Sequence, residues 1–290
     1  MGINRSRENS EAMLDSNLKA SANINGKLSL ILPARNEEAN LPRVLGRCIE
    51  VLNETLPDWE IIVVNDGSQD KTGEIAEGFA ARDSRIRVIH HPRNLGYGSA
   101  WRSGFAAAHG QYIMCMDSDG QFDIGDISLL LPYVNHYDIV AGYRTKRQDP
   151  AHRKVNAAIF HLAAKLLFGI HLKDIDCGFK IFRASLIKSL PLKAPGALIN
   201  LEIFSFAKLR KASIIEVGVH HYPRTAGVST GAKPSVVLQA MAEILLLRLR
   251  VWKERIKVSP LVGAGAAIGA LFAVLGIATR ARNRTRKERH

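Results

Sequence analysis

The chain has 290 residues, of which 47% are apolar, so it can form one large domain with a further segment appended. Its three scattered cysteines exclude a disulfide framework and a zinc site, and they predict small buried thiols in a reducing compartment. The formal charge of +13 indicates an anionic partner. The domain body shows no zinc-finger spacing and no basic helix with interleaved aromatics, whereas many cations flank an apolar C-terminal segment. This distribution favours a membrane surface and argues against nucleic acid.

The first half of the chain alternates between strand and helix patterns. Residues 1–26 are polar, lack the apolar core of a signal peptide and are predicted to be disordered. Strands are expected at 27–33, 59–64, 85–90, 112–116 and 138–141. Helices are expected between them at 38–56, 71–82 and in a segment that ends near 108. The alternation predicts an α/β fold with right-handed crossovers and a mostly parallel sheet flanked by helices.

Acidic residues follow three of these strands. Glu37 comes after the first, Asp66 after the second, and Asp117 and Asp119 after the fourth. In open α/β sheets ligands bind at the carboxyl ends of strands, and residues i and i+2 of an extended segment point the same way. Two carboxylates so placed suit Mg²⁺ or Mn²⁺, and Gln121 offers a further oxygen. The alternatives are an acidic turn that closes a strand, and helix-capping roles for Glu37 and Asp66.

The second half differs in character. Helices are expected at 152–168 and 198–210, and strands before Arg183 and at 214–219. A helix at 235–257 is apolar on one side and basic on the other. Residues 260–278 carry no charge and approach the roughly 20 residues that cross a bilayer.

We therefore expect a single transmembrane helix near the C-terminus, with a buried helix of a soluble domain as the alternative. Basic residues on both sides leave its orientation open. The predicted organisation is a tail at 1–26, a catalytic domain at 27–233, an amphipathic helix at 234–258, a transmembrane helix at 259–279 and a basic tail at 280–290.

Four short motifs occur in order along this pattern. They are P-A-R-N-E at 33–37, N-D-G-S at 65–68, D-S-D-G-Q at 117–121 and D-C-G-F-K at 176–180. Together they resemble the GT-A-fold inverting glycosyltransferases of family 2, and more narrowly the polyprenyl-phosphate (dolichyl-phosphate) mannosyl- and glucosyltransferases. The resemblance covers roughly residues 28–229.

The resemblance implies a site for a nucleoside diphosphate sugar. The matching positions for nucleotide-sugar binding are Pro33, Arg35, Glu37, Asp66, Asp117 and Ser118. The matching metal site for Mg²⁺ or Mn²⁺ is Asp117, Asp119 and Gln121, with Asp119 also counted as catalytic. The family commonly has an aromatic residue at the position of Arg35 and a second Asp at that of Asn65, so the base of the donor is left open between GDP- and UDP-hexoses.

The resemblance also implies an acceptor site. Positions associated with the acceptor phosphate match Arg144, Arg153, Arg224 and Ser229, and arginine's planar fork suits phosphate oxygens. A lipid phosphate is already anionic near pH 7 and needs no general base. Asp176, together with Arg144 and Arg224, is counted among the catalytic residues, and Asp176 would serve as a base if the acceptor were an alcohol.

The expected function is transfer of a mannose or glucose from a nucleotide sugar to polyprenyl phosphate, at the cell membrane and with the catalytic domain on the cytoplasmic face. The alternatives are transfer to a sugar or glycolipid hydroxyl, and a non-catalytic membrane scaffold that binds nucleotide sugar. Nucleic acid is not expected as a partner, and a homo-oligomer is compatible with this assignment. His90 and His91 are interpreted as ordinary strand-end or loop residues, because no third metal ligand has suitable spacing.

Overall fold

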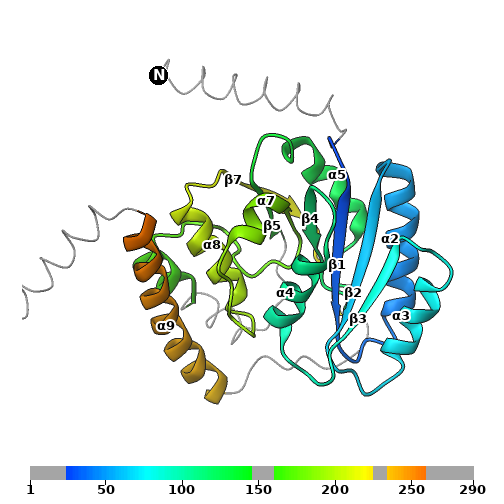
Figure 1. Ribbon diagram of the computed structural model, residues 1–290, viewed down its shortest axis with the longest axis horizontal. Helices are drawn as coiled ribbons and strands as arrows, with labels where there is room; N and C mark the ends of the chain where they lie inside the picture. The colour runs from blue at the N-terminus through cyan, green and yellow to red at the C-terminus, as the bar shows by residue number, and fades with distance from the viewer. Residues whose placement is uncertain (1–23, 146–159, 225–233, 259–290) are drawn as a thin grey trace, which may run out of the picture. The chain divides into compact units, whose positions relative to one another are not determined.

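The computed structural model describes residues 24–145, 160–224 and 234–258. Within these ranges the strands form one seven-stranded sheet in the order β3-β2-β1-β4-β6-β5-β7 (Figure 1). The strands are β1 (Leu28–Ala34), β2 (Trp59–Asn65), β3 (Ile86–His90), β4 (Tyr112–Cys115), β5 (Ile139–Arg144), β6 (Lys180–Arg183) and β7 (Ile214–Val219).

Helices alternate with the first four strands, as predicted. The α-helices are α2 (Leu41–Thr55), α3 (Thr72–Ala80), α4 (Tyr97–Ala107), α5 (Ile127–Leu130), α7 (Ala184–Ser189), α8 (Ile199–Leu209) and α9 (Pro234–Val258). Shorter helical turns are η1 (Ile124–Asp126), η2 (Leu131–Tyr133) and η3 (Ala164–Phe168). The sequence did not predict η1, α5, η2 or α7. η1, α5 and η2 together span only residues 124–133, and α7 spans only Ala184–Ser189. Segments this short show too few turns for a helical period to be recognised.

The direction of the strands confirms a mostly parallel sheet. β1 pairs in parallel with β2 and β4, β2 with β3, and β5 with β7. β6 is antiparallel to both of its neighbours, β4 and β5. The strand before Arg183 was expected from its sequence, but its antiparallel direction and its position between β4 and β5 were not. Strand order depends on contacts between residues far apart in the chain, which a local pattern does not record.

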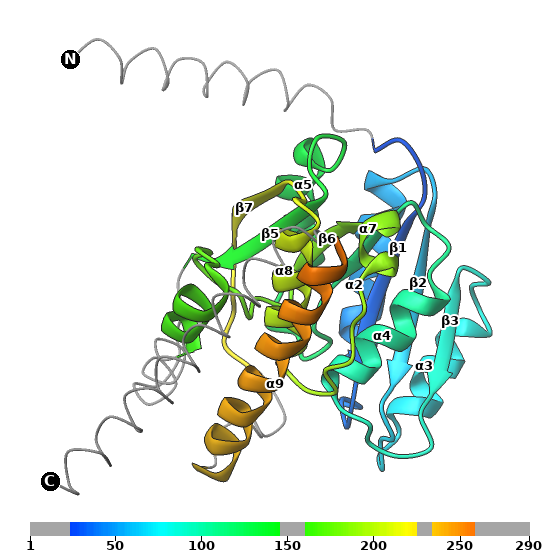
Figure 2. The same cartoon turned by 60° about the vertical axis from the view of Figure 1, so that its left-hand side comes forward.

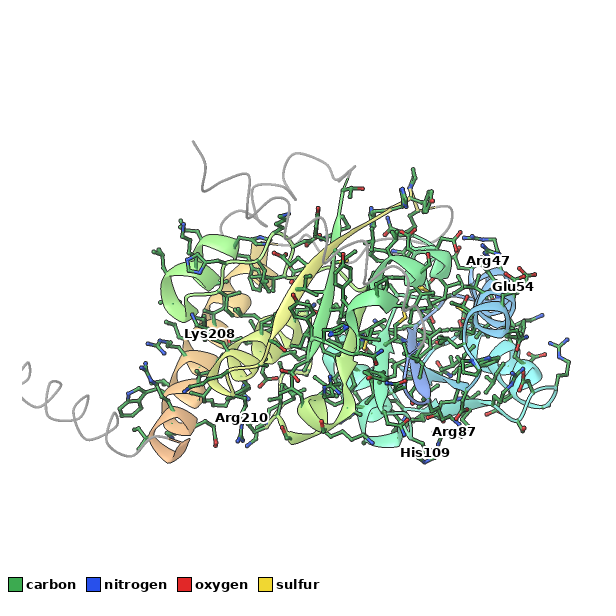
Figure 3. The ribbon with its side chains drawn as sticks, turned by 90° about the horizontal axis from the view of Figure 1, so that it is seen from above. Arg47, Glu54, Arg87, His109, Lys208 and Arg210 are labelled. Carbon is green, nitrogen blue, oxygen red and sulfur yellow. The ribbon has the colours of Figure 1, made fainter. Side chains whose placement is uncertain are left out.

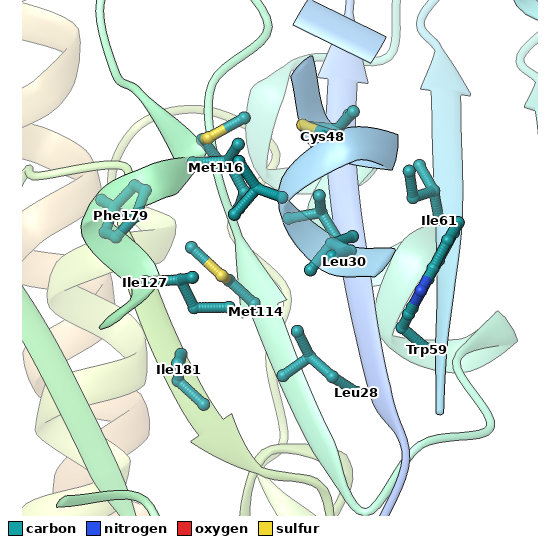
Figure 4. Packing of buried hydrophobic residues seen from close by; sticks show 14 of the residues in the cluster. Leu28, Leu30, Cys48, Trp59, Ile61, Met114, Met116, Ile127, Phe179 and Ile181 are labelled. Carbon is teal, nitrogen blue, oxygen red and sulfur yellow. The ribbon is translucent and has the colours of Figure 1, made fainter. Parts of the chain in front are cut away.

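Alternating side chains of β1 fill the two faces of the sheet. Leu28 and Leu30 join the cluster that also contains Cys48 of α2 and Met114 of β4 (Figure 4). Ile31 points the other way and meets Gly104 of α4, where an added methyl group would overlap the Ile31 side chain. Helices α2 and α3 therefore cover one face of this part of the sheet and α4 covers the other (Figure 2).

The three cysteines confirm the expectation of buried thiols. Cys48, Cys115 and Cys177 are all free and buried. Burial raises the pKa of all three thiols, that of Cys177 to about 12. A thiol with such a pKa is protonated near pH 7 and is a poor nucleophile.

Helix α9 confirms the predicted helix at 234–258. Most of it belongs to a second compact unit, which begins at Met241. Within the described ranges, no helix combines the length and the hydropathy that a membrane crossing requires. The predicted transmembrane helix at 259–279, the basic tail at 280–290 and residues 1–23 lie outside those ranges. The predicted boundaries between the parts of the chain remain predictions.

A buried carboxylate links the amino ends of β1 and β2. Glu60 accepts hydrogen bonds from Ser29 Oγ at 2.6 Å, Arg87 Nη2 at 2.8 Å and the His109 amide at 2.7 Å. Figure 3 shows Arg87 and His109 next to one another at this edge. Burial alone would raise the pKa of the Glu60 carboxyl, but these hydrogen bonds and the Arg87 charge hold it below its usual value of 4.5.

We expect Glu60→Gln to lower the free energy of unfolding at pH 7 by about 1–3 kcal/mol, because the buried, charged acceptor of three hydrogen bonds is lost. Urea denaturation measures the effect. The stabilisation is present above the ordinary pKa of 4.5 and is lost as the pH falls through the lower folded-state value, so the difference between wild type and variant should shrink as the pH is lowered below 4.5. Glu54→Gln, at an exposed position of α2 (Figure 3), is the control and should change stability by less than ~0.5 kcal/mol.

Candidate active site

A cavity of about 780 Å³ lies at the carboxyl ends of β1, β2 and β4. Parallel pairing brings these ends to the same edge, since Ala34 is opposite Asn65 and Ile31 is opposite Cys115. The predicted residues that line the cavity are Pro33, Arg35, Glu37, Asp66, Asp117, Ser118, Asp119 and Arg224. The acids of the three loops therefore share one cavity, as the sequence predicted.

The loops after β1 and β2 are joined by hydrogen bonds. Asn36 has φ 54°, a left-handed conformation that Asn tolerates better than most residues. Its amide donates to Ser68 Oγ at 3.1 Å, and its side-chain oxygen accepts from the Gln69 amide at 2.9 Å. The Glu37 amide donates to Thr72 Oγ1 at 2.8 Å. These bonds fix the positions of Glu37 and Asp66 relative to one another.

Glu37 forms an ion pair with Arg224. The guanidinium, from the segment after β7, donates to Glu37 Oε1 at 2.6 Å and lies 3.9 Å from Asp119 Oδ2. The other oxygen of Glu37 accepts from Asn40 Nδ2 at 2.7 Å. Burial raises the pKa of Glu37, and the bonds to Asn40 and Arg224 oppose that rise. A helix-capping role is not observed for Glu37, because α2 begins after Asn40 and has no side-chain cap.

Asp66 is held by donors from the segment after β3. It accepts hydrogen bonds from His91 Nδ1 at 2.7 Å, from the Leu95 amide at 2.8 Å and from the Gly96 amide at 2.9 Å. Gly96 has φ 98°, a conformation that favours glycine, and α4 begins directly after it. The sequence reading missed the contact between Asp66 and His91. The strand register would have indicated this contact. His90 ends β3 opposite Asn65, so the residues that follow them, His91 and Asp66, must be adjacent.

Asp117 and Asp119 form an acidic pair. Asp117 is partly buried and accepts a hydrogen bond from the Tyr97 hydroxyl at 2.7 Å, and Asp119 accepts from the Gln121 amide at 3.0 Å. Burial, followed by repulsion from Asp119, raises the pKa of Asp117 to about 6. Two repelling carboxylates in one cavity are a chemically suitable set of ligands for a hard divalent cation. Ser118, between them, donates to the Pro33 carbonyl at 2.7 Å and ties this loop to β1.

The third predicted metal ligand has another contact. Gln121 Nε2 donates to the Tyr222 carbonyl at 3.1 Å, and the Tyr222 amide donates back to the Gln121 carbonyl at 2.9 Å. Gln121 is not among the residues that line the cavity. No group of three His, Cys, Asp or Glu side chains within the described residues is arranged as a metal site. A cation bound by Asp117 and Asp119 would therefore need further oxygens from a molecule bound in the cavity.

Of the predicted acceptor residues, Arg224 lines the cavity and Arg144 is paired with another acid. Arg144 donates to buried Asp174 through Nε at 2.6 Å and Nη2 at 2.8 Å. Asp176 is partly buried, and this desolvation raises its pKa, with the nearby Lys180 charge opposing that rise. Neither Arg144 nor Asp176 lines the cavity, and their predicted roles remain predictions. Arg153 and Ser229 lie outside the described residues. Asp123 caps η1 by accepting a hydrogen bond from the Gly125 amide at 2.8 Å.

A mostly parallel sheet whose carboxyl edge collects acids from three loops is typical of nucleotide-binding α/β proteins. Residues 29–190 match glycosyl transferase family 2. A dolichyl-phosphate beta-glucosyltransferase from Trichomonas vaginalis is 35% identical over 79% of this chain and 76% of its own length. The chain belongs to glycosyl transferase family 2.

Two further similarities agree with this membership. An undecaprenyl-phosphate 4-deoxy-4-formamido-L-arabinose transferase from Pseudomonas fluorescens (strain Pf-5) is 28% identical over 87% of this chain and 74% of its own length. Glucosyl-3-phosphoglycerate synthase from Mycobacterium tuberculosis, solved with Mn²⁺ and UDP-glucose, has a similar fold with a TM-score of 0.60. That alignment covers 80% of this chain and 82% of the synthase at 24% identity, so it supports the GT-A fold.

Replacing Asp117 with Asn should stabilise the metal-free protein, because an amide avoids the cost of burying a charge beside Asp119. Because the pKa of Asp117 is raised, the stability that its protonated form provides below pH 3.8 is lost as the pH rises through about 6. At pH 7 and in EDTA, we expect Asp117→Asn to raise the free energy of unfolding by about 1–3 kcal/mol. Urea denaturation at pH 4 and pH 7 measures it, and an equal effect at both pH values would contradict the assignment.

Proposed function

We propose that this protein transfers a hexose from a nucleoside diphosphate sugar to a polyprenyl phosphate at a membrane. The observation on which the proposal mainly rests is that Glu37, Asp66, Asp117 and Asp119 meet in one cavity at the carboxyl edge of the sheet. Its volume of about 780 Å³ lies within the range usual for small-molecule sites. Both relatives described above are named as transferases that use a polyprenyl-phosphate acceptor, and they share three quarters of their length with this chain.

The side chains of the cavity suit both parts of a nucleotide sugar. Asp66 and Glu37 are carboxylates that accept hydrogen bonds from a base edge or ribose hydroxyls. Asp117 and Asp119, in the loop after β4, would hold Mg²⁺ or Mn²⁺ against the diphosphate. When bound, such a cation neutralises the negative charge that develops on the departing nucleoside diphosphate. Arg224 brings a second positive charge to the same part of the cavity.

The acceptor determines whether a general base is required. A phosphate monoester has a second pKa near 6, so its attacking oxygen is mostly ionised at pH 7 and needs positioning rather than deprotonation. The cavity fits this need, because Arg224 provides a cation beside Asp119. The carboxyl that would act as a base for an alcohol, Asp176, does not line the cavity. This arrangement favours a phosphate acceptor over a sugar hydroxyl.

Helix α9 supports association with a lipid surface. Its exposed side chains include Leu245, Leu246, Leu249 and Trp252, and Arg248, Arg250, Lys253 and Arg255 occur in the same helix. Apolar residues combined with arginine and lysine are typical of helices that lie in the interface of an anionic bilayer. Such a helix would keep the protein where a long isoprenoid presents its phosphate.

The transfer is tested by incubating the purified full-length protein with labelled UDP- and GDP-hexoses, MnCl₂ and polyprenyl phosphate. We expect label in the organic phase with at least one donor, and none when EDTA replaces the metal. Polyprenol without its phosphate is the parallel acceptor. Incorporation into polyprenol alone would favour transfer to a hydroxyl, and an absence of label from every donor would contradict the proposal.

Asp119→Ala should reduce transfer at least ~100-fold while the protein remains folded, because one of the two carboxylates facing the diphosphate is lost. Asp123→Asn is the matched control, since Asp123 lies in the same loop but caps η1 and does not line the cavity. Initial rates and circular dichroism are compared for both variants. An equal loss of transfer rate in the two variants would mean that transfer depends on the structure of the loop and not on the Asp119 carboxylate.

A further inference from the structure

A second cavity, of about 500 Å³, is lined by the first turns of α2, the loop after β4 and the segment after β7. Its lining includes three arginines, Arg43, Arg47 and Arg224, and one carboxylate, Asp123. Of the described residues that line this arginine cavity, Arg224 alone also lines the larger cavity proposed for the donor. The roles assigned above to the larger cavity therefore do not account for this one.

Arg43 is the arginine whose charge is least compensated. It is exposed, and it forms no ion pair with any residue in the described part of the chain. Arg47 Nε, by contrast, lies 3.4 Å from Asp123 Oδ1, and Arg224 donates to Glu37 at 2.6 Å. The guanidinium of Arg43 therefore keeps its donors for a ligand of the arginine cavity.

The backbone at Gly120 allows Arg43 to approach the loop after β4. A methyl group added at Gly120 would overlap Arg43 Nη2, so a larger residue there would displace the guanidinium. Gly120 also has φ 74°, a conformation that favours glycine. The guanidinium thus packs against the main chain next to Asp119.

Apolar side chains form much of the remaining wall. Met116, Phe122 and Ile124 line the arginine cavity and are themselves buried, so their positions are set by the packing of the core. Cys48 of α2 lines the cavity as well, and Figure 4 shows it near Met116. A ligand would therefore be stabilised by burial of an apolar part as well as by its charge.

We propose that the arginine cavity binds a phosphate monoester carried on an apolar body. A planar guanidinium can donate to two phosphate oxygens at once. A phosphate monoester carries about 1.5 to 2 negative charges near pH 7 and offers three acceptor oxygens. A carboxylate carries a single charge and two oxygens, so it would leave more of the donors of Arg43 and Arg47 unused. The inference goes beyond the proposed function and does not depend on it, because Arg43 does not line the donor cavity.

The site is tested by isothermal titration calorimetry of the purified full-length protein with phenyl phosphate, in EDTA and without nucleotide. We expect Arg43→Gln to weaken phenyl phosphate binding at least ~5-fold, because hydrogen bonds from a charged donor are lost. Arg47→Gln should weaken it less, since the charge of Arg47 is shared with Asp123. Unchanged affinity in both variants would overturn the inference.

Arg35→Gln is the matched control, because Arg35 is also exposed but lines the donor cavity and not the arginine cavity. It should change the affinity for phenyl phosphate by less than about 2-fold, since the long-range effect of one exposed charge is screened by salt. An equal loss in Arg35→Gln and Arg43→Gln would mean that phenyl phosphate does not select the arginine cavity, and would overturn the inference. Circular dichroism checks that all three variants are folded.

Two further probes separate the parts of the ligand. Inorganic phosphate should bind more weakly than phenyl phosphate, because it buries no apolar surface. Benzoate should also bind more weakly, because it lacks the phosphate oxygens. Benzoate binding as tightly as phenyl phosphate would overturn the assignment to a phosphate, and inorganic phosphate doing so would overturn the apolar body.

A vesicle arm distinguishes a lipid headgroup from a soluble phosphate ester. Flotation of the wild-type protein and of Arg43→Gln is compared on phosphatidylcholine vesicles with and without phosphatidic acid. A gain from phosphatidic acid that is smaller in Arg43→Gln would support the site and identify its ligand as a lipid. An equal gain in the two proteins, together with loss of phenyl phosphate binding in Arg43→Gln, would support the site and identify its ligand as a soluble ester.

Discussion

The parallel pairing of β1 with β2 and β4 is the constraint on which the site depends. Parallel strands must all end at the same edge, so three loops separated by tens of residues in sequence open onto one cavity. Leu30 and Ile31 pack on opposite faces of β1, against different helices, which prevents a shift of one residue in register. Such a shift would move the acids away from one another. The packing of the apolar core thus determines where the carboxylates of these loops lie.

Each acid at this edge is stabilised by a different partner. Glu37 is paired with a guanidinium. Asp66 accepts hydrogen bonds from two backbone amides and an imidazole, and Asp117 accepts one from a phenol hydroxyl. An unpaired buried carboxylate is costly, so these partners are needed for the fold as well as for a ligand. Burial and repulsion from Asp119 raise the pKa of Asp117 to about 6, so its charged form is disfavoured in the unliganded cavity. A cation is the ligand that would relieve this repulsion.

The strands that end in acids could be predicted from the sequence, because an apolar run followed by Asp or Glu is a local pattern. Both the parallel first half and the shared cavity followed from that pattern. The contacts of His91 with Asp66 and of Arg144 with Asp174 were not predictable in the same way. They join residues about 25 and 30 positions apart, and depend on strand register and on the insertion of β6. The family motifs marked which residues mattered, but not how they are paired.

The burial of all three cysteines has a practical consequence. Native thiols that are shielded from solvent and protonated at neutral pH react slowly with maleimides. A single cysteine introduced at an exposed position of α2 would then be the one fast-reacting thiol in the folded protein. A fluorophore could be attached there without first removing the native cysteines from the core. Changes in the surroundings of that fluorophore could thereby be followed in an otherwise unaltered chain.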